Sequence, residues 1–456
     1  MEAEKQSRGV FSGKLGYVLA AAGSAVGLGN IWRFPYLAAE YGGGIFLLTY
    51  LILALTFGYT LMVSETALGR MTGKSPVGAF RKLKNTRLSL AGGWINAIIP
   101  MLILPYYSVI GGWVAKYLFE YMAGHVAETA SSEYFTAFIS NASSAEGWFL
   151  VFAFLTMLVI ALGVENGVEK VSRIMMPGLV ILAVVMAIYS MTRPGAVEGI
   201  KYFLIPDLSH FSWMTVVAAL GQMFYSLSIA MGILITYGSY MKKDVNIETS
   251  MHHVIFFDSG IAILSGLMII PAVFAFSPGD AGALSQGPSL MFVTMPKIFH
   301  SMGGGRYVAI IFFVMVLFAA LTSSISLAET CASTFQDELH WSRKKSTIMV
   351  GLIVLVLGTF SSLGFSTLSN VRLLGMQILD FFDFLTNSLM MPISSFAICI
   401  FVVYVVGVKK IAEEVKLSSA FRFEGMYKVF IKYIAPFFVM VILLSSIANV
   451  LGIIHI

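Results

Sequence analysis

Polar groups that could bind a cation occur inside long apolar stretches of this sequence. Asp258 interrupts the apolar run 251–276, and Thr322-Ser-Ser324 brings three adjacent hydroxyls into the run 306–336. Carboxylate, hydroxyl and carbonyl oxygens are the ligands that hard cations prefer. The alternative for the hydroxyls is that they bond to carbonyls of their own helix. The alternative for Asp258 is that it ends a helix in interfacial water.

Two further stretches are unsuited to a continuous helix. Gly23-Ser-Ala-Val-Gly-Leu-Gly-Asn30 contains three glycines, each of which costs about 1 kcal/mol of helix propensity relative to alanine. Ser226-Leu-Ser-Ile-Ala-Met-Gly232 carries polar side chains in an apolar setting. An interrupted helix offers free N–H groups to a carboxylate and free carbonyls to a cation. The alternative is that the small residues only allow close helix packing.

The composition indicates which kind of chain must position these groups. Of the 456 residues, 58% are hydrophobic and only 12% are charged, whereas soluble domains carry about 25% charged residues. We therefore expect an integral membrane protein. The basic residues are dispersed in short loops, which argues against nucleic-acid binding. The absence of a nucleophile–base set or a metal cluster argues against an enzyme.

Eleven segments are long and apolar enough to cross a bilayer, whose apolar core of about 30 Å requires roughly 20 residues per helix. The predicted fold is an all-α polytopic membrane protein with about eleven transmembrane helices. The predicted spans are 14–37, 44–70, 92–123, 147–164, 168–191, 212–240, 251–276, 306–336, 346–366, 373–407 and 431–455.

The distribution of lysine and arginine predicts the orientation of these spans. With the N-terminus in the cytoplasm, 22 of the 29 basic residues fall in cytoplasmic segments, as the positive-inside rule requires. An odd number of spans then places the C-terminus on the outer side. The expected location is the plasma (inner) membrane, and the short loops are typical of a bacterial carrier.

The two interrupted stretches occupy corresponding positions, in spans one and six. Five helices invert the chain, so residues 1–191 and 192–407 are predicted to form two repeats of opposite topology, with 408–456 adding a cytoplasmic loop and helix 11. Paired interrupted helices are the strongest sequence indication of a transporter's binding site. Unwound backbone at membrane depth is tolerated only where protein or a cavity satisfies it.

The motifs around these breaks follow one another in a characteristic order. Gly27-Leu-Gly-Asn-Ile-Trp-Arg-Phe-Pro35 lies in the first span and Glu65-Thr-Ala-Leu-Gly-Arg70 in the second. Gln222-Met-Phe-Tyr-Ser-Leu-Ser228, Leu321-Thr-Ser-Ser324 and Asp337-Glu-Leu339 come later. From Arg8 to about Phe401 the chain resembles the neurotransmitter:sodium symporter family. The resemblance implies a sodium-coupled transporter with helices 1 and 6 unwound.

The resemblance implies two sodium sites. The first would use the substrate's carboxylate, the carbonyl of Ala25 and the side chains of Asn30, Ser226 and Asp258. The second would use the carbonyls of Gly23, Val26 and Ala319 and the hydroxyls of Thr322 and Ser323.

Asp258 departs from the pattern of many family members, which have asparagine there and bind chloride through a nearby tyrosine, glutamine and serine. The chain keeps Tyr50, Gln222 and Ser226 at the matching positions. We predict that the Asp258 carboxylate replaces chloride, so that chloride is not needed. Asp258 could also take up a proton when the empty carrier returns.

The resemblance also implies a substrate site. The family's amine carriers have an aspartate at the position of Gly27, so its absence indicates a substrate that brings its own carboxylate. That carboxylate would meet the first sodium, the N–H groups around Leu28 and Gly29, and the Tyr107 hydroxyl. The ammonium would meet the carbonyls of Ala25, Tyr225 and Ser226 and the hydroxyl of Ser228.

The pocket for the substrate's side chain contains no charge, which predicts a neutral, hydrophobic or aromatic amino acid. Ala230 replaces a glycine of some relatives and is expected to narrow the pocket by about a methyl group. Met231 replaces a phenylalanine and is adaptable in shape. The implied pocket residues are Ile103, Tyr107, Tyr225, Ser228, Met231, Ser323 and Leu327.

Charged pairs on either side of this site resemble the family's gates. Arg33 and Asp383 would form the outer pair, bridged through water because a dry pair is costly to desolvate; alternatively, Arg33 extends to the interface. Arg8 and Asp337, with Tyr240 nearby, would form the inner pair, or they are ordinary solvated charges.

Two further features, in the fifth span and at Glu65, concern helix unwinding and support of the first break. Gly167 and Pro177 match a Gly-x9-Pro pattern of the family, which predicts that the cytoplasmic half of the fifth span can unwind; the alternative is a plain kink. Glu65 is expected to hydrogen-bond the backbone near the first break.

These observations predict a sodium-coupled symporter of neutral hydrophobic or aromatic L-amino acids that works by alternating access. Helices 1, 2, 6 and 7 would rock against the rest. Proton-coupled exchange on the same fold is the competing mechanism. A non-transporting amino-acid sensor on the same fold is the competing function.

Overall fold

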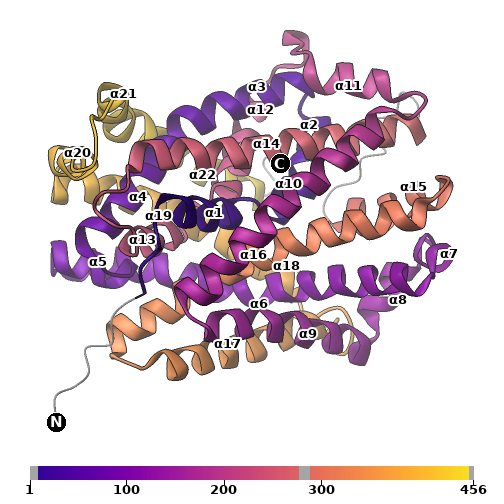
Figure 1. Cartoon of the computed structure of the whole chain (residues 1–456), viewed down its shortest axis with the longest axis horizontal. Coiled ribbons are helices and arrows are strands. Elements are labelled where there is room, and N and C mark those ends of the chain that lie inside the picture. Colours follow the sequence, from indigo (N-terminus) through magenta and orange to yellow (C-terminus); the bar gives the residue numbers. More distant parts are fainter. Residues whose placement is uncertain (1–8, 277–287, 451–456) are drawn as a thin grey trace.

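The computed structural model describes residues 9–276 and 288–450; their regular elements are all helices, joined by turns and irregular segments, and no β-strand occurs among these residues. The long helices lie roughly side by side, and several are interrupted or bent (Figure 1). Polar residues fix several helix starts. Ser212, for example, forms a capping box with Thr215 at the start of α12 (Trp213–Ser226), which satisfies two otherwise free N–H groups.

The helices of the first half are α1 (Lys14–Ala25), α2 (Phe34–Glu40), α3 (Gly44–Leu53), α4 (Tyr59–Thr72), α5 (Pro76–Leu83), α6 (Arg87–Ala123), α7 (Val126–Thr129), α8 (Tyr134–Ser140), α9 (Ala142–Ala161) and α10 (Lys170–Met191). Those of the second half are α11 (Ala196–Leu204), α12, α13 (Ile233–Ser239), α14 (Ile247–Phe276), α15 (Met295–Ser301), α16 (Gly305–Leu339), α17 (Arg343–Leu363), α18 (Ile378–Asp383) and α19 (Met391–Ile400). The last helices of the described residues are α20 (Val408–Lys416), α21 (Glu424–Val429) and α22 (Ala435–Val450).

Short π-helical turns join several of these helices into longer spans. Within the described residues, nine helices are long and apolar enough to cross a membrane, and the bent pair formed by Lys14–Ala25 and Gly29–Glu40 makes ten. The predicted sixth span, 212–240, is occupied by α12 and α13, which are separated by a longer irregular segment. The all-helical membrane fold with interrupted first and sixth spans is therefore confirmed.

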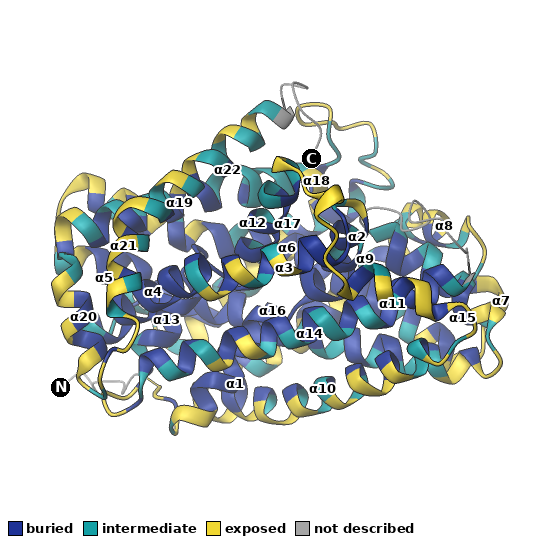
Figure 2. Ribbon diagram, turned by 90° about the horizontal axis from the view of Figure 1, so that it is seen from above, coloured by how far each residue is buried: buried dark blue, intermediate teal, exposed yellow. Residues whose placement is uncertain are grey.

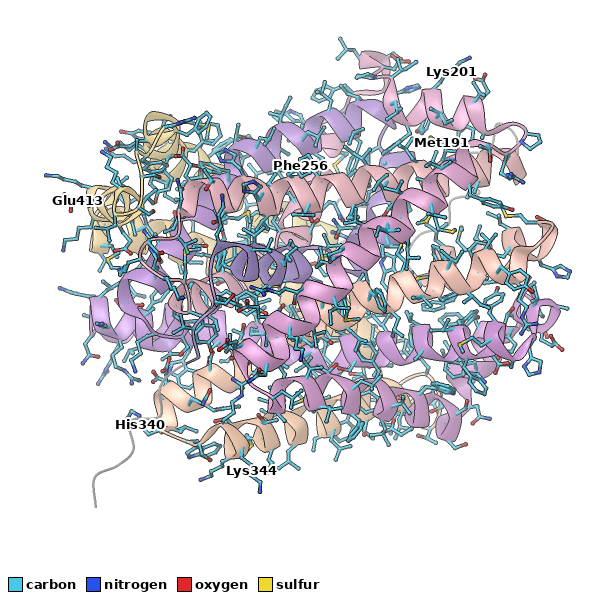
Figure 3. All side chains as sticks on the ribbon, viewed as in Figure 1. Met191, Lys201, Phe256, His340, Lys344 and Glu413 are labelled. Carbon is cyan, nitrogen blue, oxygen red and sulfur yellow. The ribbon has the colours of Figure 1, made fainter. Side chains whose placement is uncertain are left out.

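The surface of the helical body carries the apolar belt that a bilayer requires. Figure 2 shows buried residues in the interior and exposed ones along the outward faces of helices such as α10. Phe256, in the first half of α14, is 73% exposed and lies between the two ends of the molecule (Figure 3). Such a side chain is stable in contact with lipid rather than water.

The two ends of the molecule differ in the loops that they carry. Figure 3 places Lys344 and Glu413 toward one end and Met191 and Lys201 toward the other. The first end also holds α5, α20 and α21 (Figure 1). It is the end that the charge distribution predicts to be cytoplasmic.

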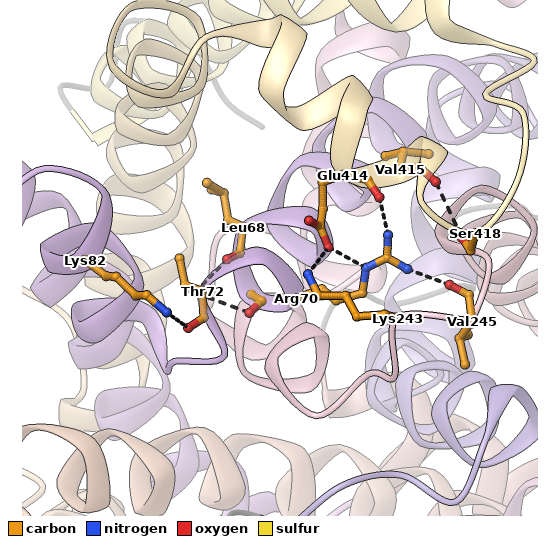
Figure 4. Close-up of polar contacts among 10 residues, drawn as sticks. Leu68, Arg70, Thr72, Lys82, Lys243, Val245, Glu414, Val415 and Ser418 are labelled. Carbon is orange, nitrogen blue, oxygen red and sulfur yellow. Dashed lines mark hydrogen bonds and ion pairs between the residues drawn. The ribbon is translucent and has the colours of Figure 1, made fainter.

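A buried ion pair attaches α20 to α4 at this end (Figure 4). Arg70 donates from Nε to Glu414 Oε1 at 2.8 Å, and its other nitrogens reach the carbonyls of Val245 and Glu414. Lys243 Nζ lies 2.7 Å from the same carboxylate oxygen. Because the Arg70 side chain is fully buried, its charge depends on Glu414 for compensation.

We expect Glu414→Gln to destabilise the protein, since losing one partner of a buried ion pair costs about 3–5 kcal/mol. Thermal unfolding in detergent should show a melting temperature several degrees lower. Glu413→Gln is the matched control. Glu413 is exposed, and its ion pair with Lys409 is long, at 3.9 Å, so its loss should cost little stability. Equal melting temperatures for the two variants would contradict this assignment.

Candidate functional site

The first break lies between α1 and the π-helical turn Gly29–Arg33. The chain leaves α1 at Val26, which has an extended conformation, and the helices on either side are inclined by 54°. The Gly27 N–H donates to Asn30 Oδ1 at 3.1 Å and the Leu28 N–H to Tyr107 Oη at 3.3 Å. Side chains therefore satisfy the backbone groups that the broken helix leaves free.

The second break, between α12 and α13, contains two non-glycine residues in the left-handed region. Ser228 has a φ of 53° and Ala230 a φ of 62°. Such residues are strained and persist only where their surroundings hold them. The Ala230 N–H donates to Glu65 Oε1 at 2.8 Å. Glu65 thus supports the second break, which corrects the prediction that it would bond near the first.

The two breaks meet at the centre of the molecule. Ser24 Oγ and Ser228 Oγ are 2.9 Å apart, and the Ser228 hydroxyl also donates to the Ser24 carbonyl at 3.0 Å. A cavity lies between the breaks and the side chains of α6 and α16. It is lined by Ser24, Ala25, Gly27, Leu28, Gly29, Asn30, Ile103, Tyr107, Tyr225, Ser226, Ser228, Met231, Ile233, Ser323 and Leu327.

All eleven residues predicted to bind substrate line this one cavity. Four further residues line it that the substrate prediction did not include: Ser24, Gly27, Asn30 and Ile233. The first three lie within the glycine-broken stretch 23–30, so that stretch was the signal that could have identified them. Ala230, which was expected to narrow the pocket, is not among the described lining residues.

Asp258 is the centre of a buried polar cluster beside this cavity. Its Oδ1 accepts from Ser226 Oγ at 2.5 Å and from Asn30 Nδ2 at 2.7 Å, and its Oδ2 accepts from the Tyr50 hydroxyl. Asp258 is fully buried, which excludes the alternative that it faces interfacial water. Three of the four predicted first-sodium residues are thus in direct contact, and the fourth, Ala25, lines the adjacent cavity.

The three adjacent hydroxyls of α16 behave differently from one another. Thr322 donates to carbonyls of its own helix, at Phe318 (2.9 Å) and Ala319 (3.2 Å). Ser324 also bonds within α16, to the Leu321 carbonyl at 3.0 Å. Ser323 instead reaches α1, where its Oγ lies 3.1–3.4 Å from three carbonyl oxygens of residues 23, 24 and 26. Back-bonding thus accounts for Thr322 and Ser324 but not for Ser323.

We expect Ser323→Ala to weaken sodium activation and Ser324→Ala to leave it nearly unchanged. Ser323 is the one hydroxyl of the three described that faces the carbonyls of the first break, whereas Ser324 bonds to α16 and to Thr156. Losing one ligand should raise the sodium concentration for half-maximal uptake about tenfold, equivalent to about 1.4 kcal/mol. Sodium titrations of amino-acid uptake measure both variants, and identical titrations would contradict the prediction.

Tyr225 separates this cavity from a second, outer one. It lines both and packs so closely on Gly29 that a Cβ added there would be 2.4 Å from its ring. Arg33 lies over the Tyr225 ring, 5.6 Å from its centroid, and donates to Gln222 Oε1 at 3.3 Å.

The Asp383 carboxylate forms its hydrogen bonds with residues other than Arg33. It accepts from the Tyr106 hydroxyl at 3.1 Å and from Asn387 Nδ2 at 2.6 Å. Among the described ion pairs within 4.0 Å, none joins Arg33 to Asp383. The predicted outer pair is therefore not a direct salt bridge here, in keeping with the high cost of drying two charges.

The opposite side of the cavity is closed by aromatic packing. Phe11 is buried against the rings of Tyr17, Tyr237 and Tyr240, with centroids 5.4–6.0 Å apart. Asp337 accepts from the Ser75 N–H at 2.6 Å. Tyr240 donates to Glu329 Oε1 at 2.7 Å.

Arg8, the predicted partner of Asp337, lies outside the described residues. The fifth span, by contrast, is fully described and helical, with a π-helical start (Val164–Glu169) that continues into α10. Gly167 lies against the preceding helix, since a Cβ added there would be 2.2 Å from the Val159 carbonyl oxygen. Close packing is thus one reason for this glycine, and unwinding remains a prediction.

Comparison with known proteins identifies the family. Residues 8–141 and 136–453 match the sequence profile of the Sodium:neurotransmitter symporter family. The chain belongs to this family. An uncharacterized sodium-dependent transporter, YhdH of Bacillus subtilis (strain 168), is 34% identical and the match covers 96% of this chain and 97% of the relative. The bovine sodium-dependent dopamine transporter is 26% identical, with 98% of this chain and 70% of the relative covered.

A solved structure gives the same fold. The crystal structure of MhsT in complex with L-phenylalanine superposes with a TM-score of 0.87 and 37% sequence identity, covering 96% of this chain and all of that chain. The symporter is therefore a sodium-dependent, multi-pass membrane transporter. This confirms the family, sodium dependence and fold predicted from the sequence.

Proposed function

We propose that the protein is a symporter that couples the inward movement of sodium to uptake of a neutral, hydrophobic or aromatic L-amino acid. The observation that carries the proposal is the central cavity, which lies between the two breaks and has no charged side chain among its described lining residues. MhsT, which shares the fold, binds L-phenylalanine. An uncharged pocket favours an uncharged side chain, because burying a lone charge is costly.

Both ends of an amino acid find complementary groups in this cavity. The helical segment that begins at Gly29 directs its N-terminus into the cavity, and a helix N-terminus favours a carboxylate. The Tyr107 hydroxyl, already bonded to the Leu28 N–H, would donate to the same carboxylate. The ammonium would bond to the carbonyls of Ala25, Tyr225 and Ser226 and to the Ser228 hydroxyl.

Two sodium ions would bind beside the amino acid. The first would lie on the Ala25 carbonyl, the Asn30–Ser226–Asp258 cluster and the substrate's carboxylate, so that it binds best when substrate is present. The second would lie where Ser323 faces the α1 carbonyls, with Gly23, Val26, Ala319 and Thr322 completing the ligands. Oxygen donors of this kind suit a hard cation.

Transport is proposed to be independent of chloride. The resemblance assigns chloride to donors from Tyr50, Gln222 and Ser226. Tyr50 and Ser226 both donate to the Asp258 carboxylate, and the Gln222 amide donates to the Gly29 carbonyl at 3.0 Å. In this proposal, the Asp258 carboxylate is the anion that accepts hydrogen bonds from these donors, in the place of chloride.

Alternating access would open the cavity to each side in turn. The bundle of helices 1, 2, 6 and 7 would rock against the remaining helices, within two repeats bounded at residues 191 and 407. Tyr225 would close the outer path and the Phe11 cluster the inner one. The N-terminus would lie in the cytoplasm and the C-terminus outside.

Uptake of labelled amino acids into proteoliposomes tests the proposal, with sodium, chloride and pH varied independently. We expect accumulation of leucine-, methionine- or phenylalanine-like substrates that needs an inward sodium gradient and is unchanged when gluconate replaces chloride. Chloride-stimulated uptake would overturn the chloride proposal alone. Binding without uptake would indicate a sensor, and uptake driven only by a proton gradient would indicate proton-coupled exchange.

A further inference from the structure

A groove lies on the outside of the helical body, remote from the central cavity. It runs between α5, the first part of α6 and α19, and its volume is about 390 Å³. Small residues at Gly92 and Ala397 form part of its lining, and a Cβ added at Gly92 would be 3.0 Å from the Phe80 ring. Phe80 and Phe401 stack along it with centroids 4.2 Å apart. The groove is therefore a formed, mainly aromatic and aliphatic surface.

The groove opens to the membrane side of the molecule. Leu88, Ile393 and Val405 line it and are 82%, 41% and 39% exposed. The helices that form it lie at the same end as α20 (Figure 1), and the exposed residues of α19 and α20 lie on outward faces (Figure 2). Because α6 and α19 belong to candidate membrane spans, we expect the apolar part of the groove to contact the hydrocarbon region of the bilayer.

Polarity in the groove is confined to one end. Its polar lining residues, Lys84, Thr86 and Ser89, all come from the loop before α6 and its first turn. The remainder of the lining is apolar. A groove with one cationic, hydroxyl-bearing end and a long apolar body matches an amphiphile with an anionic head and a hydrocarbon tail.

The loop before α6 and the start of α20 carry basic side chains that have few acidic partners in the described part of the chain. In the described part of the chain, Lys84, Arg87 and Lys410 have no acidic side chain within 4.0 Å. Lys409 has only the exposed Glu413 at 3.9 Å. Two acids at the same end of the molecule are already paired: Glu414 of α20 with Arg70, and Glu338 with Arg81 of α5. Basic pockets between membrane helices on the cytoplasmic side recognise anionic lipid head groups.

We propose that this groove binds one anionic phospholipid of the leaflet that faces the basic loops. The phosphate of the head group would lie at Lys84 and the Thr86 and Ser89 hydroxyls, with Arg87, Lys409 and Lys410 adding positive charge around it. One acyl chain would lie along Gly92 and Ala397, against the stacked pair of Phe80 and Phe401 and the ring of Phe396. The site is distinct from the amino-acid cavity and does not depend on which amino acid is transported.

Native mass spectrometry of the full chain tests the proposal, after exchange into detergent with defined amounts of phosphatidylglycerol or phosphatidylcholine. We expect one phosphatidylglycerol to be retained at concentrations at which phosphatidylcholine is lost. Lys84→Glu should reduce this retention at least tenfold, and Lys84 is exposed, so the variant should fold. Lys344→Glu, an exposed lysine at the same end, is the control and should retain the lipid.

A second pair of variants tests the apolar part of the groove. Ala397→Phe fills it and should release the lipid, whereas Val185→Phe, on the 46% exposed outer side of α10, should not. Equal retention of both phospholipids, or retention unaffected by Lys84→Glu, would overturn the proposal. If the unmodified protein is a dimer without retained lipid, and Ala397→Phe makes it monomeric, the groove would instead bind a second copy of the chain.

Discussion

Asp258→Asn should convert a chloride-independent transporter into one that needs chloride. The variant keeps the size of the side chain but removes the negative charge to which Tyr50, Ser226 and Asn30 donate. Losing a buried, hydrogen-bonded charge beside a cation costs about 2–5 kcal/mol. In chloride-free medium, the sodium concentration for half-maximal uptake should therefore rise at least thirtyfold. Chloride should restore much of the loss, because it can occupy the place of the missing carboxylate.

Uptake at a series of sodium concentrations, with chloride or gluconate as the anion, measures this effect. Asp380→Asn is the control, since Asp380 is an exposed carboxylate on α18 and its loss should leave the sodium titration unchanged. A variant that transports normally without chloride would show that the Asp258 charge is not needed for sodium binding.

Gly27→Ala should weaken amino-acid binding. A Cβ at this position would lie 2.7 Å from Ser323 Oγ and 3.1 Å from Tyr107 Oη, and both oxygens belong to the lining of the cavity. Overpacking of this kind costs about 1–3 kcal/mol, which corresponds to an affinity about 5- to 150-fold lower. An aspartate, as in amine carriers, would meet the same two oxygens, so the site as folded has no room for it.

Equilibrium binding of labelled amino acid to the purified variant measures the effect separately from transport. Gly260→Ala is the matched control: it also adds a methyl group to a membrane helix, but nothing lies within 4 Å of its Cβ. If Gly27→Ala bound the amino acid with wild-type affinity, the side chains of Ser323 and Tyr107 would be able to move away from the added methyl group. The size of residue 27 would then not select the substrate.

The spacing of apolar runs and glycines was sufficient to predict the helical spans and the places where they break. Helix starts differed from the predicted ones where a cap or a turn outside the apolar run decided them. The third span begins at Arg87 rather than 92, because Thr86 accepts from the Ser89 N–H. The tenth begins at Ile378 rather than 373, after a turn in which Gly375 has a φ of 80°.

The candidate site was predictable only as a set of residues, because sequence order does not specify which hydrogen bonds form. Glu65 could have supported either break, and the structure places Ala230 against it. Thr322 and Ser323 are adjacent and both carry hydroxyls, yet one bonds within its helix and the other across to α1. The lipid-facing groove left no signal at all, since its parts come from residues 80–95 and 393–405.

The ion pair between Arg70 and Glu414 has a consequence for how the cytoplasmic face moves. Together with the 2.9 Å bond between Ser64 and the Tyr427 hydroxyl, it fastens the loop between the tenth and eleventh spans to α4. Gly407, with a φ of 90° and open space around its Cβ position, separates that loop from α19. When α4 tilts, α20 should move with it and rotate about Gly407. A spectroscopic probe attached at residue 413 would then report the opening of the central cavity, although that cavity is buried deep inside the protein.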